Sequence, residues 1–576
     1  MRLSAALRTP DRPRASRARV LLRGAVAALT VVGVLVPGVA AAGPSTRIDR
    51  YVVVYGGTPA GVAAAIAAAE AGARVTLLAD GSTVGGIMSN GISATDIGSA
   101  GAVRGIALEF FQNVRAHYGD PATWRFEPQV AERIFREMLT RRGVQVRTNA
   151  PLSRVVVQNR KITCLVVLPA RSYCAESFVD ASYTGDVLAK GGVPTRLGMA
   201  DLLDHGEALP LTRDWERVIA APADGADAAT AAYVQNPFIR TPSTLPAYRD
   251  VYGHGGPSLA YRLCVTPDAA RAVPFRPAAN YAQLLPSFRL MAGSMHSMVE
   301  TKSNGTLNSD VFQLARLPGG KYDLNAGWKA FTNIPAPAGY FDSRAARSYY
   351  NKVLRGYVES FFYFVGTDPS VPQALRTEFA RFGLCADEFT DNGNWPREPY
   401  VREARRLQGR YTMTERDLFT TRTKSGAIAL GSYNVDIKIS QWVSVDGELF
   451  RDRAVHSTAP VYEIPYTAMV PRTGSVLNVL APVAVSSSPT AYGSLRMEPQ
   501  YMAMGQAAGI AAALAARNDR SVATLPVAWV QKVLRAEGAR YKAVDVCRAT
   551  SQTFRAAGGY TADCSQVLPV APRRLY

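Results

Sequence analysis

The sequence predicts an α/β protein with a Rossmann-like FAD-binding domain, an antiparallel β-meander and an inserted α+β substrate domain. Three observations support this class. Residues 51–78 show the pattern of a strand, a glycine turn, a small-residue helix and a second strand. Residues 154–180 read as a hairpin followed by a strand that returns to the first sheet. Residues 206–425 lack the pattern and are rich in aromatic side chains.

The first strand is predicted at Tyr51–Tyr55, an apolar run typical of a strand buried on both faces. The turn 56–61 follows, and the Ala-rich run Val62–Ala71 is expected to form a helix that packs closely on a sheet. Gly72 suits the left-handed end of that helix. Arg74–Leu78 then reads as a second strand, which completes a βαβ unit.

This unit is suited to a dinucleotide. Gly56, Gly57 and Gly61 permit a tight turn, and the helix N-terminus offers N–H groups and partial positive charge to a pyrophosphate. Thr58 stands where the second glycine of G-x-G-x-x-G is expected, and Asp80, one place late, is the candidate acceptor for a ribose hydroxyl. The alternative reading is an ordinary βαβ turn without a ligand.

Two features favour FAD over NAD. Gly85 and Gly86 form a second glycine stretch that lets the chain pass against the cofactor. A helix over about 127–142 and a strand at 144–146 are followed by antiparallel strands at 154–158 and 162–168, and 177–180 leads back to the sheet. A parallel unit interrupted by a meander suits the FAD-binding variant of the fold.

At 180–186 the chain reads D-A-S-Y-T-G-D, which resembles the D-A-T-Y-E-G-D stretch of the bacterial FAD-dependent oxidoreductases, a branch of the glutathione-reductase-like flavoproteins. Further stretches match this family in order and spacing: Tyr261–Thr266, Lys321–Asn325, Asp387–Phe389, Asn394–Pro396, Tyr400–Arg406, Ile428–Tyr433, Tyr462–Tyr466 and Tyr492–Pro499. The resemblance adds Asp180, Gly185 and Arg496 to the expected cofactor-binding residues.

A second small-residue helix is predicted to open at Met504–Gly509 and to continue over 510–516. The resemblance implies that its N-terminus, with Gly505 and Gln506, points at the flavin ring, where the helix dipole would stabilise negative charge. Tight structural packing is the alternative reading of this helix.

The chain departs from the family at two histidines, which are Pro489 and Lys438 here. Proline cannot titrate, so Lys438 is a catalytic candidate, provided that burial lowers its pKa towards neutrality against the opposing charge of Asp436. The other candidate is Arg402, as an electrostatic clamp. With Arg405 and Arg406 it is placed in one helical neighbourhood.

The domain boundaries follow from these matches. The FAD-binding domain is expected to be discontinuous, from 43–205 and 426–525, with 206–425 inserted as the substrate domain and 526–576 as a C-terminal extension. Residues 1–42 read as an export signal, with seven Arg, a short apolar stretch and a small-residue cleavage site. We expect no integral membrane span in the mature chain.

Export makes disulfides plausible, and the sequence suggests the pairs Cys164–Cys174 and Cys547–Cys564. The formal charge is +19, of which the export signal contributes +6, and the remaining basic residues are scattered. We therefore expect no nucleic-acid partner. No dense cluster of Cys and His indicates a metal.

The leading functional hypothesis is an exported FAD-dependent oxidoreductase that removes hydride from a small or carbohydrate-like substrate, with oxygen or another carrier as electron acceptor. A degenerate member that binds glycan or cell-wall material is the alternative. It is favoured by the lost histidine at Pro489 and by a family cysteine that is Ala484 here. Flavin chemistry without net redox is a third class.

Overall fold

A five-stranded parallel sheet forms the centre of the N-terminal half, in the order β28 (Val479–Leu480), β8 (Ser177–Asp180), β2 (Val52–Tyr55), β3 (Val75–Leu78) and β4 (Gln145–Arg147). All four residues of β2 are buried. Val52 and Val54 belong to the hydrophobic core on one face, and Val53 and Tyr55 to the core on the other. The predicted strands of the βαβ unit and the returning strand are confirmed.

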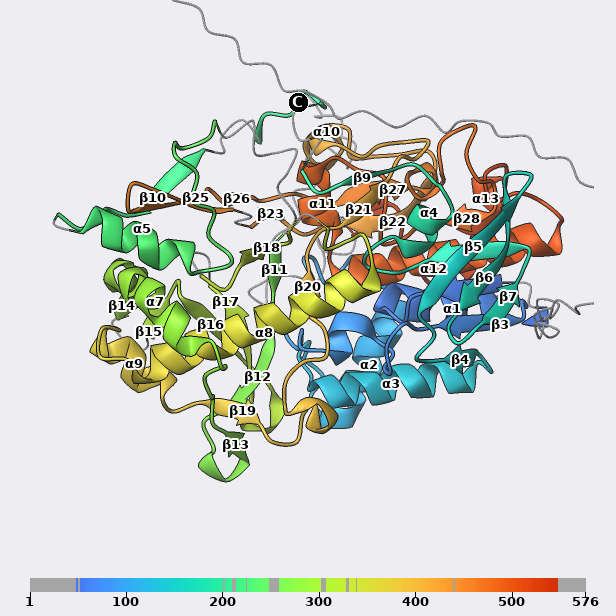
Figure 1. Cartoon of the computed structure of the whole chain (residues 1–576). Helices are drawn as coiled ribbons and strands as arrows, with labels where there is room; N and C mark the ends of the chain where they lie inside the picture. The colour runs from blue at the N-terminus through green and yellow to red at the C-terminus, as the bar shows by residue number, and fades with distance from the viewer. Residues whose placement is uncertain are drawn as a thin grey trace, which may run out of the picture. The chain divides into compact units, whose positions relative to one another are not determined.

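Helices cover one face of this sheet: α1 (Pro59–Glu70), α2 (Ile106–Tyr118), α3 (Pro128–Arg141) and α12 (Glu498–Arg517). In Figure 1, α12 lies along α1. A Cβ at Gly505 would lie 2.2 Å from the carbonyl oxygen of Ala60, and one at Gly509 would lie 2.1 Å from that of Ala64. The two backbones therefore touch through these glycines.

The predicted start of this C-terminal helix at Met504 is wrong. The helix begins six residues earlier, at Glu498, and Pro499 occupies its first turn, where a proline costs no hydrogen bond. Gly505 and Gln506 therefore lie in the body of α12, and its positive N-terminal end is at Glu498.

The meander covers the other face. Its strands are β5 (Leu152–Gln158), β6 (Lys161–Val167) and β7 (Arg171–Cys174), and β1 (Ile48–Asp49) pairs with β7. Asn159 and Arg160 both have positive φ, as a two-residue hairpin turn requires. The predicted disulfide Cys164–Cys174 forms across β6 and β7.

The computed structural model describes residues 48–49, 52–199, 201, 204–209, 214–223, 225–247, 258–301, 307–327, 331–337, 339–438 and 441–546. The predicted export signal at 1–42 and the predicted pair Cys547–Cys564 lie outside the described residues. Within the part of the chain that is described, no helix is long and apolar enough to cross a membrane.

The middle of the chain builds a second core around an antiparallel sheet. Its strands are β13 (Ala272–Val273), β19 (Gly383–Cys385), β12 (Leu263–Thr266), β17 (Tyr322–Ala326) and β16 (Phe312–Arg316). The helices of this region are α5 (Ala226–Val234), α7 (Tyr281–Met295), α8 (Arg344–Thr367) and α9 (Gln373–Phe379). A disulfide that the sequence analysis did not foresee, Cys264–Cys385, joins β12 to β19.

Short sheets complete the fold. They are β10 (Trp215–Ile219), β25 (Glu448–Asp452) and β24 (Trp442–Val445); β18 (Ile334–Pro335), β11 (Ser258–Ala260) and β20 (Tyr400–Val401); β14 (Val299–Thr301) with β15 (Leu307–Ser309); β9 (Thr195–Leu197) with β21 (Arg405–Leu407); β22 (Ala427–Gly431) with β27 (Tyr462–Pro465); and β23 (Val435–Ile437) with β26 (Val455–Ser457). The remaining helices are α4 (Asp186–Lys190), α10 (Glu415–Phe419), α11 (Pro489–Leu495) and α13 (Val527–Ala536).

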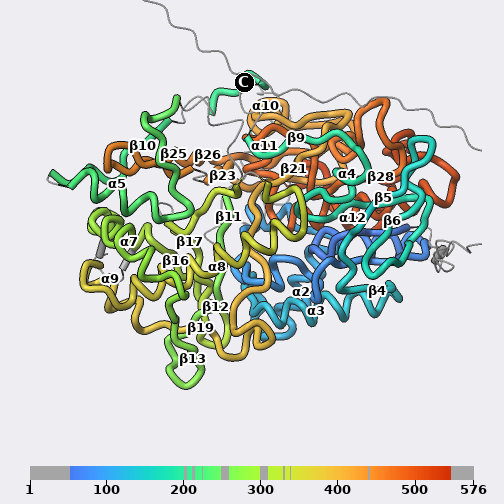
Figure 2. The backbone as a smooth tube through the Cα atoms, in the orientation of Figure 1, coloured from blue at the N-terminus to red at the C-terminus, as the bar shows by residue number. Residues whose placement is uncertain are grey.

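Residues from both ends of the described chain share the first core. Figure 2 traces the orange and red segments back to the blue N-terminal βαβ unit. Trp442 and Leu449, by contrast, pack in the second core with the middle region. The division into 43–205, 206–425 and 426–525 stays a prediction.

Candidate functional site

A cleft of about 810 Å³ lies where β2 and β3 end and α1 begins. It is lined by the 56–58 turn, Asp80, Gly86 and Asn90, by the 182–186 loop, and by residues of α8 and of the 396–401 segment. Its volume is in the range of cofactor pockets. The carboxyl ends of parallel strands and a helix N-terminus meet here, as in other α/β ligand sites.

The glycines of the turn are required by close packing. A Cβ at Gly56 would lie 2.5 Å from the backbone of Ala181, and one at Gly61 would lie 1.9 Å from the carbonyl oxygen of Gly56. Gly57 faces Ala79 in the same way, at 2.7 Å. The strand, turn and helix can approach this closely only without side chains.

Thr58 substitutes for the missing glycine by capping α1. Its Oγ1 accepts a hydrogen bond from the Gly61 N–H at 3.1 Å and donates to the Ala181 carbonyl at 2.8 Å. The side chain is buried between these two groups, and Pro59 follows it at the start of the helix. A threonine therefore fits this position, and the helix N-terminus is still formed at the cleft.

The second glycine stretch packs directly on the first. The N–H groups of Gly85 and Gly86 both donate to the Gly57 carbonyl, at 2.6 and 3.0 Å, and both glycines have positive φ. Asn90 donates through Nδ2 to the Gly86 carbonyl at 2.8 Å, and its Oδ1 is buried without a hydrogen-bond partner among the described residues. Asn90 thus keeps an acceptor available at the cleft wall.

Asp80 lines the cleft just after β3. Its Oδ1 is buried and accepts no hydrogen bond from the described residues, while Arg344 Nε lies 3.5 Å away as an ion-pair partner. Burial raises the pKa of this carboxyl. This Oδ1 makes no hydrogen bond within the described residues, so it is available to a donor such as a ribose hydroxyl. This residue and the helix N-terminus fit a dinucleotide such as FAD.

Asp180 and Gly185 shape the loop beside the cleft. Asp180 is fully buried at the end of β8, where it accepts hydrogen bonds from the backbone and hydroxyl of Ser182 and from the Leu188 N–H. Burial raises its pKa to about 6. Gly185 has φ +63° at the start of α4. Neither lines the cleft, but both hold the loop whose Asp186 does and pairs with Arg347 at 2.9 Å.

A second, smaller cavity of about 110 Å³ adjoins this cleft. In the extended 399–402 segment, Val401 lines the cleft, whereas Tyr400 and Arg402 line the cavity, as the alternation of a strand requires. Tyr183 of the cleft donates a hydrogen bond of 2.8 Å to Glu498 of the cavity. The two spaces therefore share a wall.

Both catalytic candidates line this cavity, together with the predicted cofactor residue Arg496. Lys438 Nζ lies 3.4 Å from Asp436 Oδ1, so the two residues share one face of the extended chain. Arg496 donates to the Asp436 carbonyl at 2.7 Å and pairs with its Oδ2 at 3.1 Å. Burial lowers the pKa of Lys438 to about 8, although the charge of Asp436 opposes this change.

Arg402 is 4% exposed and held by neutral groups. Its Nη1 donates to Asn333 Oδ1 at 3.0 Å and lies 3.4 Å from Ser258 Oγ. The guanidinium also lies 4.9 Å from the ring centre of Tyr400. Burial lowers the pKa of Arg402 to about 10, so it stays charged near neutral pH.

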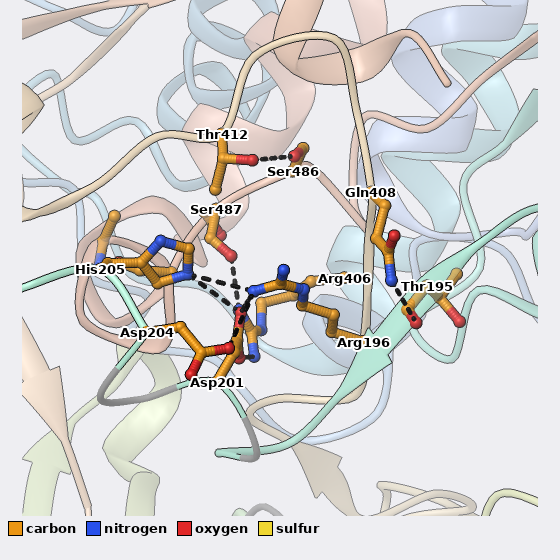
Figure 3. Close-up of polar contacts among 12 residues, drawn as sticks. Thr195, Arg196, Asp201, Asp204, His205, Arg406, Gln408, Thr412, Ser486 and Ser487 are labelled. Carbon is orange, nitrogen blue, oxygen red and sulfur yellow. Dashed lines mark hydrogen bonds and ion pairs between the residues drawn. The ribbon is translucent and has the colours of Figure 1, made fainter. Parts of the chain in front are cut away.

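The expected helical grouping of Arg402, Arg405 and Arg406 is wrong. The segment is extended because β20 pairs with β11 and β21 pairs with β9, and the three side chains diverge. Arg405 donates to the Thr184 carbonyl at 2.9 Å. Arg406 is fully buried against Asp201 at 2.6 Å, where Arg196 and His205 also converge (Figure 3). Arg406 therefore has a structural role that sequence spacing did not reveal.

Gly505 and Gln506 lie in the body of α12, where Gly505 packs on Ala60 of α1. Gln506 accepts from the Ile106 N–H at 3.2 Å and donates to Glu537 at 2.7 Å. Neither residue lines the cleft or the cavity. Their assignment as cofactor-binding residues stays a prediction.

Several cavity residues escaped the sequence analysis. Arg262 forms a two-point ion pair with Asp323, at 2.8 and 2.7 Å, and Glu498 begins α12. Arg262, Asp323 and Glu498 all lie in stretches that match the family. These matches were the signal that could have identified them, but the sequence spacing did not indicate that the three side chains meet at one cavity.

Comparisons with known proteins complete the description. The family model for the FAD dependent oxidoreductases matches residues 51–534. No curated protein matches the chain. Solved structures with local similarity include the THI4 protein of Thermovibrio ammonificans (18% identity, TM-score 0.21, 26% of this chain and 63% of that one) and a flavin monooxygenase from Stenotrophomonas maltophilia (15%, 0.18, 23% and 38%).

A thioredoxin reductase from Lactococcus lactis is similar at 18% identity, with a TM-score of 0.17, over 23% of this chain and 35% of that one. The chain thus spans less than two thirds of each of these structures. The family match covers most of the chain and includes the glycine turn, Asp80 and every residue named at the two cavities. The chain belongs to the FAD dependent oxidoreductase family, and its cofactor is FAD.

Proposed function

We propose that this protein is exported and oxidises a small or carbohydrate-like substrate by hydride removal. FAD would occupy the large cleft, and the reacting part of the substrate would enter the small cavity. The observation that carries this proposal is the wall that the two spaces share, formed by Tyr400–Val401 and by the Tyr183–Glu498 hydrogen bond. Oxygen or another carrier would accept the electrons.

The cofactor would be held by Asp80 at the ribose and by the N-terminus of α1 at the diphosphate. Bound FAD supplies a two-electron acceptor, which none of the side chains at this site provides. Arg344 and Arg347 of α8 stand over the same cleft and add positive charge.

Within the cavity, Lys438 is the group best placed to accept a proton from the substrate. With a pKa of about 8, a useful fraction of its side chain is neutral at slightly alkaline pH. Asp436 orients the amine through its 3.4 Å contact, and Arg496 holds Asp436 from the other side.

Export is supported by the signal-like residues 1–42 and by the two disulfides among the described residues. A carbohydrate-like substrate is proposed because residues 206–425 are rich in aromatic side chains, which can stack on sugar rings. We propose a small-molecule partner and no nucleic acid, because the basic residues do not form a continuous patch in the sequence.

The test begins with the absorption spectrum of the purified mature protein. Wild type should carry flavin bands that bleach when an oxidisable substrate is added under anaerobic conditions. Asp80→Ala should lower FAD affinity at least tenfold, since it removes a carboxyl that lines the cleft, whereas Asp204→Ala, at an acid outside the cleft, should leave it unchanged. Gly61 is unsuitable for this purpose because any side chain there meets the Gly56 carbonyl.

Two results would contradict the proposal. A colourless protein that cannot be reconstituted with FAD would favour the binding-module hypothesis instead. A flavin that converts a substrate without bleaching or consuming an electron acceptor would indicate chemistry without net redox.

A further inference from the structure

The small cavity contains more positive than negative charge. Four cationic side chains line it, each at least nine-tenths buried: Arg262, Arg402, Lys438 and Arg496. Asp323 compensates Arg262 through a two-point ion pair. Asp436 is shared between Lys438 and Arg496, at 3.4 and 3.1 Å.

Arg402 has no carboxylate partner in the described part of the chain. Its hydrogen bonds go to Asn333 and Ser258, and its face lies on the ring of Tyr400. A buried guanidinium whose hydrogen bonds go only to neutral groups is costly, because water is removed and the charge of Asp436 acts on it without a direct ion pair. An anion beside Arg402 would remove this cost.

The two further acids of the cavity, Asp96 and Glu498, do not reverse this balance. Burial raises the pKa of Glu498 to about 8, so this side chain is mostly protonated at neutral pH. The side chain of Asp96 is exposed, so it is counted here as a carboxylate. Against the four cations the described residues supply three carboxylates, Asp96, Asp323 and Asp436, so one positive charge is left over.

Two unsatisfied donors of the cavity point the same way, while Asn325 Oδ1 and Asp436 Oδ1 are unsatisfied acceptors in the same lining, within the part of the chain that is described. Arg496 Nε is a buried donor without a hydrogen-bond partner among the described residues, although its side chain is only 3% exposed. Glu498 Oε2 is also buried and unpartnered, and it is a potential donor in the protonated acid. Buried polar groups of this kind are normally satisfied, so both indicate a ligand that accepts hydrogen bonds.

We propose that the substrate carries a carboxylate, which binds in this cavity between Arg402 and Arg496. This inference rests on the proposed function and narrows its substrate to small carboxylic acids, including acidic sugars. A carboxylate presents two coplanar acceptors that match guanidinium donors. The cavity of about 110 Å³ holds only a small group, and one added negative charge suffices to pair Arg402.

The experiment measures anion binding to the FAD-loaded protein by titration calorimetry, with the flavin spectrum as a second readout. The probes are acetate, its neutral counterpart acetamide, and inorganic phosphate. We expect acetate to bind with one site per chain and at least tenfold more tightly than either of the others. Acetamide binding as tightly as acetate would overturn the proposal, and so would tighter binding of phosphate.

Variants of Arg402 and Arg451 test whether acetate binds in the small cavity. Arg402→Met should weaken acetate at least tenfold, and Arg402→Lys should restore part of the affinity because the charge returns. Arg451→Met is the matched control, since Arg451 is a buried arginine outside the cavity, paired with Glu216 at 2.8 Å. Unchanged acetate binding in Arg402→Met, or equal losses in Arg402→Met and Arg451→Met, would overturn the assignment.

Failure of this inference is distinguishable from failure of the proposed function. A flavoprotein that bleaches with substrate but does not bind acetate refutes only the carboxylate site. A protein that cannot hold flavin refutes the proposed function, and the same titration on that protein still decides whether the cavity binds an anion.

Discussion

Lys438 allows the electrostatics of the cavity to be tested through stability. Its ammonium group is buried, and its pKa falls from 10.5 to about 8 in the fold. This difference corresponds to about 3 kcal/mol, at 1.36 kcal/mol for each pH unit. Between pH 8 and 10.5 the unfolded chain binds more protons at this site than the folded chain, so the free energy of unfolding of wild type gains this contribution as pH rises.

The perturbation is Lys438→Met, which removes the titrating group and keeps a similar volume. The free energy of unfolding of the variant minus that of wild type should be largest at pH 7. This difference should fall by about 3 kcal/mol by pH 10.5. With an unfolding entropy of about 2.1 cal/mol/K per residue over roughly 500 residues, this equals about 3 °C in melting temperature.

The assay is the melting temperature of both proteins at half-unit steps from pH 7 to pH 10.5 at constant ionic strength. Only the difference between the two curves is interpreted, because other groups titrate equally in both. Asp436 stays ionised in both proteins, because Arg496 and Arg402, which neither protein lacks, lower its pKa against the effect of burial. Parallel curves over the whole range would refute the reasoning.

Three further predictions concern packing and covalent links. Thr58→Val should cost about 1–2 kcal/mol, because it removes the cap on α1 and the bond to Ala181; an unchanged denaturation midpoint would contradict the capping role. Gly505→Ala should lower the melting temperature through its 2.2 Å approach to the Ala60 carbonyl, whereas Gly293→Ala, a helical glycine with open space around it, should be neutral or stabilising; equal effects would argue against close α1–α12 packing. Replacing Cys264 and Cys385 by Ser should lower the free energy of unfolding by about 5 kcal/mol, because the disulfide joins residues 121 apart. The same change at Cys164 and Cys174, which are 10 apart, should cost about 3 kcal/mol. Chemical denaturation of the two double variants measures both values, and the reverse order would show that loop length does not govern the effect.

Local sequence was sufficient where local interactions decide the structure. The apolar run at Val52–Tyr55, the Ala-rich α1 and the glycine turn predicted the βαβ unit because strand burial, helix packing and tight turns depend on neighbouring residues. The hairpin at 152–167 was predictable for the same reason, since Asn159 and Arg160 form its turn. The family motifs then identified FAD.

Tertiary structure decided the rest. Helix α12 begins at Glu498 and not at the predicted Met504. Pro499 lies in its first turn, where a proline is tolerated, so the helix extends over the residues before Met504. Arg402 and Arg406 separate because strand pairing extends their segment, which no helical spacing could express. The pairing of Cys264 with Cys385 depends on two strands far apart in the chain.

The charged cavity shows most clearly what the sequence determines and what only the tertiary structure decides. Arg262, Arg402, Lys438 and Arg496 come from four separate segments, and each alone is an ordinary basic residue. The sequence determined which side chains were available and marked several of them by motif. Only the fold decided that they surround one small space with too few carboxylates, because burial and mutual distance, which set their electrostatics, are properties of the assembled chain.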